Sequence, residues 1–347
     1  MHELLKGHDR RDTRVVAVDG HLLEVTDLFD TYWYLAAERQ AMFFCRVEGR
    51  PAPWTQDAIL RSHRFTNAYR ASDRVSQYLL QHVIYNDDYD VPDVVLRVLL
   101  FKLFNRIETW EDLVAAVGEP TLATFDPVPY SLALDRRFAA DERLYSAAYI
   151  MPSPQLGHDR KHANHLHLLD QLIRNGTLAR LAKAPTLAAL YEDLRSVPSF
   201  GPFLAFQYAI DLNYSEGFDF DEMDFVVPGP GALRGISKCF ASTGGLDAVG
   251  VIRAVANSAD RFLNEHSFRD LWGRPLQLID CQNLFCEVDK YARVSHPHLS
   301  CGGPTRIKQS YAVDRRPLSL GYAPKWELPH SATSPTRILG TENLTLL

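Results

Sequence analysis

One segment of the chain is apolar around most of its helical circumference, namely residues 91–118, VPDVVLRVLLFKLFNRIETWEDLVAAVG. A helix that is apolar on nearly all sides must be covered by other elements, so this segment predicts a fold in which helices pack around it. Apolar residues recur at helical spacing elsewhere, as in 27–49, 162–176 and 276–294. We find no internal repeat and no sustained strand-type alternation. The sequence therefore predicts a mainly α fold.

Composition limits the class of protein and its surroundings. The 347 residues are 46% hydrophobic and 23% charged, as expected of a globular protein, and no apolar run reaches the roughly 18 residues of a membrane span. The polar N-terminus does not resemble a secretory signal, and five cysteines without a CxxC pair predict reduced thiols. We expect an intracellular protein without membrane association, located in the cytoplasm, or in the nucleus of a eukaryotic cell. The net charge of -6 means that any contact with DNA must come from a local basic face.

The chain is expected to have three regions. Residues 1–26 form an N-terminal arm with short β-type runs such as RVVAV. Residues 27–298 form the helical domain. Residues 299–347 are rich in Pro, Ser, Thr and Gly and predict an irregular or partly disordered tail.

A small turn between two helical patterns predicts an anion site. It lies in residues 196–205, SVPSFGPFLA, where Gly201 can adopt conformations denied to other residues and Pro202 suits the first turn of a helix. Exposed N–H groups at such a helix start can bind a phosphate. The stretch resembles the hairpin of the helix-hairpin-helix DNA glycosylases, usually Leu-Pro-Gly-Val-Gly, with Ser199 at the first Gly. Ser199, Phe200 and Gly201 would then contact DNA. An ordinary turn between two helices remains the alternative.

The acidic run that follows this hairpin carries a candidate catalytic group. In the glycosylase superfamily an Asp lies about twenty residues beyond the hairpin, and Asp224 stands at about that distance, with Asp221 as the alternate. A solvated acidic loop is the competing interpretation. Gly229 and Gly231, in PGPG before a helical pattern, would let backbone approach a phosphate or a sugar closely. Phe203 stands near the position of the Schiff-base Lys of the bifunctional glycosylases, so lyase chemistry by that route is not expected.

Two further groups of polar residues lie on helical frames. The first surrounds Arg70 and Arg74, whose i,i+4 spacing puts two planar guanidinium groups on one face, suited to phosphate. A surface salt-bridge network is the alternative for this group. The second is the series Asp280, Asn283, Glu287 and Lys290, which forms one stripe on a helix. The spacing of the Cys and His residues fits no standard zinc site, and we expect neither a metal nor a cofactor.

Together these segments resemble one family, the helical domain of the 5-hydroxymethyluracil DNA kinases and of the related alpha-glutamyl/putrescinyl thymine pyrophosphorylases. The matching pieces run in order from about residue 29 to residue 294: YWYLAAERQ, PWTQDAIL, FTNAYRASDRVS, LFNRIETWEDL, the hairpin, VVPGPGALRGI and CQNLFCEVDKYAR. The resemblance implies a helix-hairpin-helix, DNA glycosylase-like fold and a role in the hypermodification of DNA bases. The kinase members carry a separate P-loop domain, and the motif GxxxxGK[ST] is absent from these 347 residues.

The resemblance implies an enzyme that acts on a modified thymine or uracil base flipped out of double-stranded DNA, transferring or removing a group there. Two alternatives stay open: a monofunctional DNA glycosylase, and a non-catalytic DNA-binding module that positions a separate base-modifying kinase. The expected catalytic residues are Asp224, Glu287 and Lys290. The expected substrate- or phosphate-binding residues are Arg39, Arg46, Trp54, Asn67, Arg70, Arg74, Asn105, Gly229, Gly231, Asn283, Tyr291 and Arg293.

Overall fold

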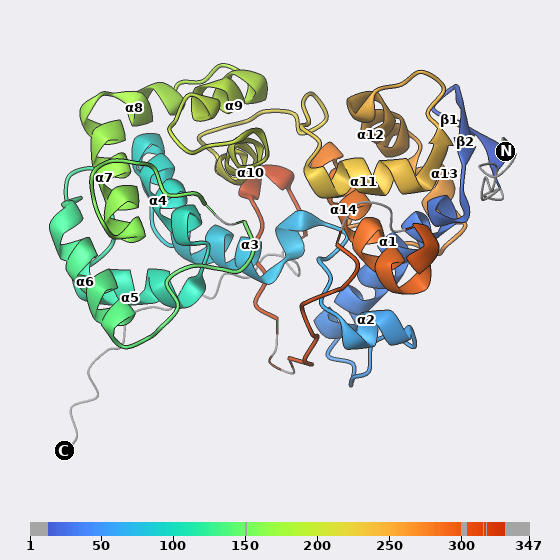
Figure 1. The fold of residues 1–347 in the computed structure, drawn as a ribbon, viewed down its shortest axis with the longest axis horizontal. Helices are drawn as coiled ribbons and strands as arrows, with labels where there is room; N and C mark the ends of the chain where they lie inside the picture. Colours follow the sequence, from blue (N-terminus) through green and yellow to red (C-terminus); the bar gives the residue numbers. More distant parts are fainter. Residues whose placement is uncertain (1–12, 150, 300–303, 315, 317, 330–347) are drawn as a thin grey trace, which may run out of the picture. The chain divides into compact units, whose positions relative to one another are not determined.

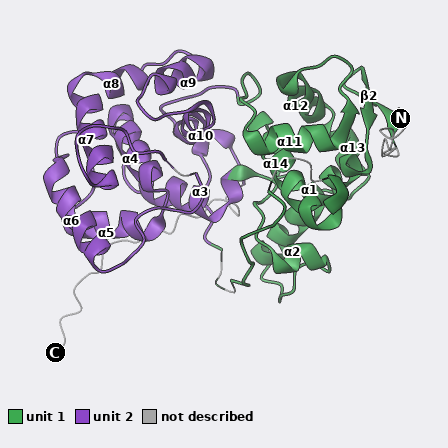
Figure 2. Cartoon of the chain, in the orientation of Figure 1, with its two compact units in different colours: residues 1–70, 222–318 green, residues 71–221, 319–347 purple. Residues whose placement is uncertain are grey.

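The structure, a computed structural model, describes residues 13–149, 151–299, 304–314, 316 and 318–329. Within these residues the chain forms 14 α-helices and one small antiparallel sheet, which confirms the mainly α fold. The chain divides into two compact units (Figure 2): unit 1 comprises residues 1–70 and 222–318, and unit 2 comprises residues 71–221 and 319–347. The expected helical domain, 27–298, is thus shared between both units. Among the described helices, none combines the length and the apolar character that crossing a bilayer requires.

Unit 1 contains the sheet and a group of helices from both ends of the chain (Figure 1). Its elements are β1 (Arg14–Val18), β2 (His21–Val25), α1 (Asp27–Val47), α2 (Ala58–Ser62), α11 (Pro230–Cys239), β3 (Phe240–Ser242), α12 (Ala248–Asn257), α13 (Ala259–Asn264), α14 (Leu278–Ser295) and a 3-10 turn (Pro297–Leu299).

Two of the three strands of the small sheet come from the region expected as an N-terminal arm. Strands β1 and β2 form a hairpin whose two turn residues, Asp19 and Gly20, both have positive φ angles, 48° and 78°. This conformation suits the right-handed twist of a two-residue hairpin. β2 also pairs with β3, so the order is β1-β2-β3. The first part of the expected arm, residues 1–12, lies outside the described residues.

Helices α11 and α14 approach closely because α11 carries a glycine at the crossing point. A Cβ atom added to Gly235 would lie 2.0 Å from the carbonyl oxygen of Phe285, far inside the van der Waals distance. One turn earlier, a Cβ on Gly231 would lie 2.9 Å from the Sγ of Cys286. The missing side chains at these two positions let the backbones of the helices pack together.

Unit 2 is a helical assembly around the segment that is apolar on most sides (Figure 1). Its elements are α3 (Arg74–Tyr78), a π-helical turn (Leu79–Ile84), α4 (Val91–Phe104), α5 (Ile107–Val117), α6 (Pro127–Ala139), α7 (Lys161–Arg174), α8 (Thr177–Leu181), α9 (Leu187–Arg195), α10 (Pro202–Asn213) and a 3-10 turn (Pro324–Trp326). A further 3-10 turn (Arg70–Ser72) lies where unit 1 passes into unit 2. Eleven residues of α4, from Val94 to Phe104, are buried, as the sequence predicts.

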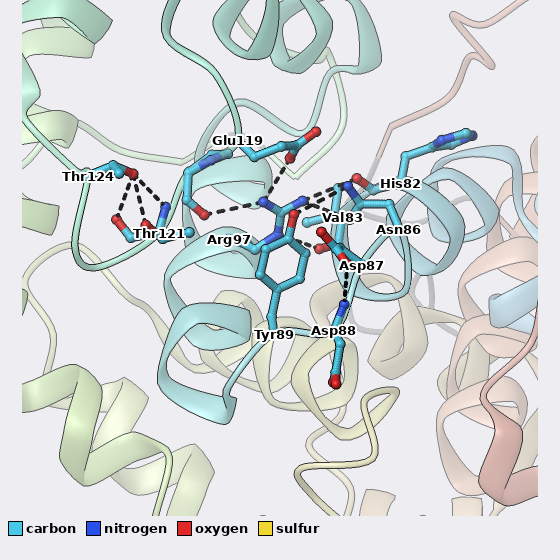
Figure 3. Close-up of polar contacts among 11 residues, drawn as sticks. His82, Val83, Asn86, Asp87, Asp88, Tyr89, Arg97, Glu119, Thr121 and Thr124 are labelled. Atoms are coloured by element: carbon cyan, nitrogen blue, oxygen red, sulfur yellow. Dashed lines mark hydrogen bonds and ion pairs between the residues drawn. The ribbon is translucent and has the colours of Figure 1, made fainter. Parts of the chain in front are cut away.

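A fully buried arginine on α4 organises the loops at one end of unit 2. Figure 3 shows the guanidinium of Arg97 surrounded by acceptors: the carbonyl of Val83 at 2.7 Å, the side-chain oxygen of Asn86 at 2.9 Å and a carboxylate oxygen of Glu119 at 2.8 Å. Its Cζ atom also lies 4.0 Å from the ring centroid of Tyr89. A buried cation is tolerated only when its donors are satisfied, so these contacts fix the segments that follow the π-helical turn and α5.

The expected helical hairpin is present as α9 and α10, with the turn between them. Ser199 has a φ of 72°, whereas Gly201 has an ordinary φ of −71° and is the N-cap of α10. The expectation that Gly201 adopts the unusual backbone conformation is therefore wrong. The left-handed conformation falls on Ser199, at the place where the glycosylase pattern has its first glycine. Phe200 anchors the turn, with its ring 4.7 Å from that of Tyr208.

The described part of the tail is irregular. Residues 304–314 belong to unit 1, where the N–H of Tyr311 donates to the carbonyl of Ser62, whereas the segment that ends at residue 329 is attached to unit 2. In residues 318–329 only the 3-10 turn Pro324–Trp326 is regular. The ammonium group of Lys325 donates to the carbonyls of Asn213 and Phe218 at 2.6 and 2.5 Å. The irregular character of this part is as expected, and residues 330–347 of the expected tail lie outside the described residues.

The close contact of α11 with α14 leads to a prediction for Gly235→Ala. We expect a free energy of unfolding lower by about 2 kcal/mol or more, because the added methyl group meets the Phe285 carbonyl. Thermal and urea unfolding followed by circular dichroism measure this loss. Gly201→Ala is the control, since its Cβ would meet nothing within 4 Å. Alanine is the better helix former, so an unchanged or raised stability of Gly235→Ala would contradict this packing.

Candidate functional site

Unit 1 brings polar side chains from α1, from the loop before α2 and from α14 to residues 64–70, most of which form neither helix nor strand. Two carboxylates of α14 accept hydrogen bonds from this stretch: Asp280 from the Arg70 N–H at 2.7 Å, and Glu287 from the Thr66 N–H at 3.0 Å. Asp280 and Glu287 are seven residues apart, so they lie on the same side of the helix. α14 therefore holds the stretch at two points.

Arg39 of α1 holds the same stretch from another side. Its Nε donates to the carbonyl of Thr66 at 2.8 Å, and its Nη2 donates to the side-chain oxygen of Asn67 at 2.8 Å and to the carbonyl of Phe65 at 3.3 Å. The planar guanidinium fork thus fixes both the backbone and the orientation of the Asn67 amide. Arg39 and Asn67, both expected as binding residues, are brought together in this way.

Asp57 joins three elements of unit 1. Its Oδ2 accepts the hydroxyl protons of Tyr34 at 3.0 Å and of Tyr291 at 2.6 Å, while its Oδ1 caps α2 by accepting the N–H groups of Ile59 and Leu60. Burial, together with this carboxylate, raises the pKa of both phenols well above the ordinary tyrosine value. Both tyrosines therefore stay protonated near neutral pH and serve as hydrogen-bond donors.

Lys290 and Glu38 of the cluster also have polar partners. The ammonium of Lys290 lies 3.2 Å from Glu287 Oε2 and 4.5 Å from the ring centroid of Phe65. On α1, Glu38 accepts a short hydrogen bond from the hydroxyl of Thr55. Glu287 also accepts the Thr66 N–H, so both Glu287 and Lys290 contact residues 64–70 directly.

Asp280 is a carboxyl of this cluster whose pKa the fold raises. Burial raises the pKa of Asp280 to about 7, although the N–H groups of Arg70 and Gln277 that bond to its carboxylate oppose the rise. The nearby carboxylate of Glu222 adds to the rise, and the guanidinium of Arg274 opposes it. Asp280 is thus poised to exchange a proton near neutral pH, and its bonds to the backbone depend on that proton.

The other expected binding residues of unit 1 lie on α1, in the loop before α2, at residue 70, on α14 and at the start of α11. The side chain of Arg46 lies over the ring of Trp54, 5.2 Å from its centroid. Arg70 and Asn283 are 3% and 8% exposed, so little of either reaches solvent. Arg293 pairs with Asp289 one turn before it, at 2.8 Å.

The loop before α11 holds Asp224 at the surface. The backbone carbonyl of Asp224 accepts a hydrogen bond from Arg253 at 3.0 Å, and none of the described residues bonds to its carboxylate. Gly229 is the N-cap of α11, and Gly231, in the first turn, packs against Cys286 of α14. Among the described residues, no N–H group at the start of α11 bonds to the Asp224 carboxylate.

Four of the expected positions fall in unit 2 beside Phe200, which is buried in the hairpin turn. Arg74 is the exposed first residue of α3. Asn105 is buried at the C-terminus of α4 with a left-handed φ of 47°, a conformation that asparagine tolerates better than most residues. Ser199 and Gly201 lie in the hairpin turn, where Gly201 is exposed and has open space around it.

Tyr34 is a member of the cluster that was not among the expected site residues. It stands four residues before Glu38 on α1, so the two share one helix face. That i,i+4 pairing of a phenol with a carboxylate, beside the buried Trp33, is a signal that the sequence contains. Within the described part of the chain, no group of three or more Cys, His, Asp or Glu residues could hold a metal ion.

Fold and site together define a mainly helical protein whose polar cluster contains carboxylates, phenols bonded to one of them, and an amide. Residues 26–301 match the family described as 5-hmdU DNA kinase, helical domain, and the chain belongs to this family. It is similar to the 5-hmdU DNA kinase of Bacillus phage SP10, with 26% identity over 289 residues, covering 76% of this chain. The chain matches only 45% of the length of that relative. No solved structure matches it.

The buried carboxyl of Asp280 predicts a dependence of stability on pH. Its folded pKa of about 7 lies above the ordinary value of 3.8, so between these values the folded state binds more protons than the unfolded state. The resulting stabilisation is fully present below the unfolded pKa and is lost as pH rises through the folded pKa. We expect the free energy of unfolding to fall by up to a few kcal/mol between about pH 4 and about pH 8 from this group alone.

Asp280→Asn should flatten this part of the profile, which denaturant unfolding at a series of pH values measures. Asp260→Asn, an exposed position on α13, is the control and should keep the wild-type slope. A profile of Asp280→Asn that parallels the wild type would rule out proton binding at this carboxyl.

Proposed function

We propose that this protein is an enzyme of DNA base hypermodification that acts on a thymine- or uracil-derived base turned out of the duplex. The observation that carries the proposal is the polar cluster of unit 1, which joins α1, Asp57, residues 64–70 and α14. A flipped base is recognised by hydrogen bonds to its polar edge, and the cluster offers both donors and acceptors. The relative named 5-hmdU DNA kinase points to 5-hydroxymethyluracil as the base to test first.

Within this proposal the expected residues take different parts. Asp224 has an exposed carboxylate that no described residue occupies, so it is available to stabilise positive charge or to orient a nucleophile. Glu287 and Lys290 act as acid, base or phosphate-holding groups at the edge of the 64–70 stretch. Arg39 is a positioning residue, because it donates hydrogen bonds to the carbonyl of Thr66 and to the side chain of Asn67.

The hairpin of unit 2 is the proposed contact with the DNA backbone. Helix α10 begins at Pro202 with no side-chain cap, since its N-cap residue, Gly201, has no side chain to provide one. The first N–H groups of a helix can bind an anion, and a Cβ atom added to Gly201 would meet nothing within 4 Å. The basic residues Arg46, Arg74 and Arg293 are proposed as further phosphate contacts.

One observation favours a second candidate, a non-catalytic module that positions a separate base-modifying kinase on DNA. Glu287 and Lys290 are bonded to each other and to the 64–70 stretch, as purely structural groups would be. The 347 residues also contain no GxxxxGK[ST] loop for a nucleoside triphosphate. A monofunctional glycosylase is the third candidate, and it would leave an abasic site.

Mass spectrometry of nucleosides separates these candidates. Duplex DNA containing 5-hydroxymethyldeoxyuridine, its phosphorylated form or thymidine is incubated with the protein, with water or a free amine as acceptor. A nucleoside of changed mass supports the proposed enzyme. Free base with abasic sites identifies a glycosylase, and unchanged DNA that is nevertheless bound identifies the positioning module.

The same assay tests Asp224. Asp224→Asn keeps the size of the side chain and removes its charge, so folding and DNA binding should persist while turnover falls by about 100-fold or more. Asp221→Asn, three residues earlier in the same acidic run, is the matched control and should be nearly silent. If the two variants behave alike, Asp224 has no catalytic part.

For the hairpin, Gly201→Leu should weaken DNA binding roughly tenfold, because the added side chain keeps a phosphate from the first N–H groups of α10. Affinity measured over a salt series should fall linearly with the logarithm of salt concentration for the wild type. Ala140→Leu adds similar bulk at an exposed position of the same unit and serves as the control. Unchanged affinity of Gly201→Leu would remove the hairpin from DNA recognition.

A further inference from the structure

A hollow of about 450 Å³ opens beside the hairpin, within unit 2. It is bounded on one side by the start of α10, including Gly201, Phe203 and Leu204, and on the other by the segment that follows α6, including Tyr149 and Pro152. Its lining consists largely of carbon atoms, although it lies at the surface. An apolar hollow of this size is large enough for a planar ring system.

Two aromatic rings form one wall of the hollow. The rings of Tyr149 and Phe203 are stacked, with centroids 5.7 Å apart and planes inclined by only 5°. Both residues line the hollow and neither is fully buried, so the stack presents aromatic surface to it. Aromatic side chains presented in this way are what proteins use to bind unstacked bases, because every base has a π-face.

A buried ion pair supports the ring of Tyr149. The ammonium of Lys102 lies 4.9 Å from the ring centroid of Tyr149 and 3.0 Å from a carboxylate oxygen of Asp211. The side chains of this pair are 4% and 1% exposed. A cation at an aromatic face holds the ring in place, and the carboxylate balances its charge, so Tyr149 is positioned before any ligand arrives.

We propose that this hollow is a stacking subsite for one nucleobase of DNA that is out of the duplex stack, held on the Tyr149–Phe203 pair. The inference rests on the proposed function, since it assumes that the protein binds DNA, and it adds a base-binding subsite in unit 2 to the phosphate contact at Gly201. The subsite recognises a flat ring and not a sequence, because its lining provides apolar and aromatic surface. A fully paired duplex has no base to offer it.

The test uses the full chain and oligonucleotides that carry 2-aminopurine, whose fluorescence is quenched when it stacks. Three probes are compared: a single strand, a duplex with the 2-aminopurine opposite an abasic site, and a fully paired duplex. We expect the wild type to quench the first two probes and to leave the third unchanged. Phe203→Leu keeps an apolar side chain but removes the ring, and it should lose the quenching and bind the first two probes about tenfold more weakly.

Phe138→Leu is the matched control, because Phe138 is a 51% exposed aromatic residue of α6 that does not line the hollow. It should bind and quench as the wild type does. If circular dichroism shows that Phe203→Leu does not fold, Tyr149→Leu replaces it. This variant removes the other ring of the pair, and it should lose the quenching in the same way.

The outcomes separate the subsite from the proposed function. Quenching and affinity that survive in Phe203→Leu overturn the stacking subsite, while DNA binding and its loss in Gly201→Leu leave the proposed function standing. Equal quenching of the paired duplex overturns the preference for an unstacked base. If the wild type binds none of the probes, the proposed function and the subsite fall together.

Discussion

Residues 64–70 cross the polar cluster of unit 1 largely without helical or strand hydrogen bonds, so their N–H groups depend on side chains for partners. Asp280 and Glu287 supply two of these partners from one side of α14, and Arg39 supplies donors for the carbonyls. A buried N–H group without an acceptor is costly. The course of this stretch, and the orientation of the Asn67 amide, therefore depend on the side chains of two helices.

α14 can perform this role because α11 fixes its position. Gly235 lets the backbone of α11 approach Phe285, and the carboxylate of Asp289 lies 2.9 Å from the ammonium of Lys238 on α11. Close backbone packing and a buried ion pair together leave the helix little freedom to slide or rotate. The position of the polar cluster thus depends on the packing of α14 against α11.

Unit 2 uses buried cations in a comparable way. Arg97 gathers the segments that follow the π-helical turn and α5, and Lys102 lies against Tyr149 while paired with Asp211. In both places the buried cation contacts a segment that has no regular secondary structure. Membership of the 5-hmdU DNA kinase helical-domain family gives these arrangements a context in DNA base modification. Of these two cations, Lys102 lies against a ring of the proposed base-binding hollow, that of Tyr149.

The sequence by itself determined the helical class, the buried character of α4, the pair of helices around residues 196–201 and the stripe of polar residues on α14. These features follow from local periodicity and turn chemistry, which depend only on neighbouring residues. Tertiary structure alone decided that Asp280 and Glu287 face backbone N–H groups of residues 64–70, that Tyr34 and Tyr291 share Asp57, and that Ser199, not Gly201, takes the left-handed conformation. It also divided residues 27–298 between two units. Such outcomes depend on which segments are brought into contact, and these are often more than 200 residues apart in the sequence. A local sequence pattern does not predict which distant segments will meet.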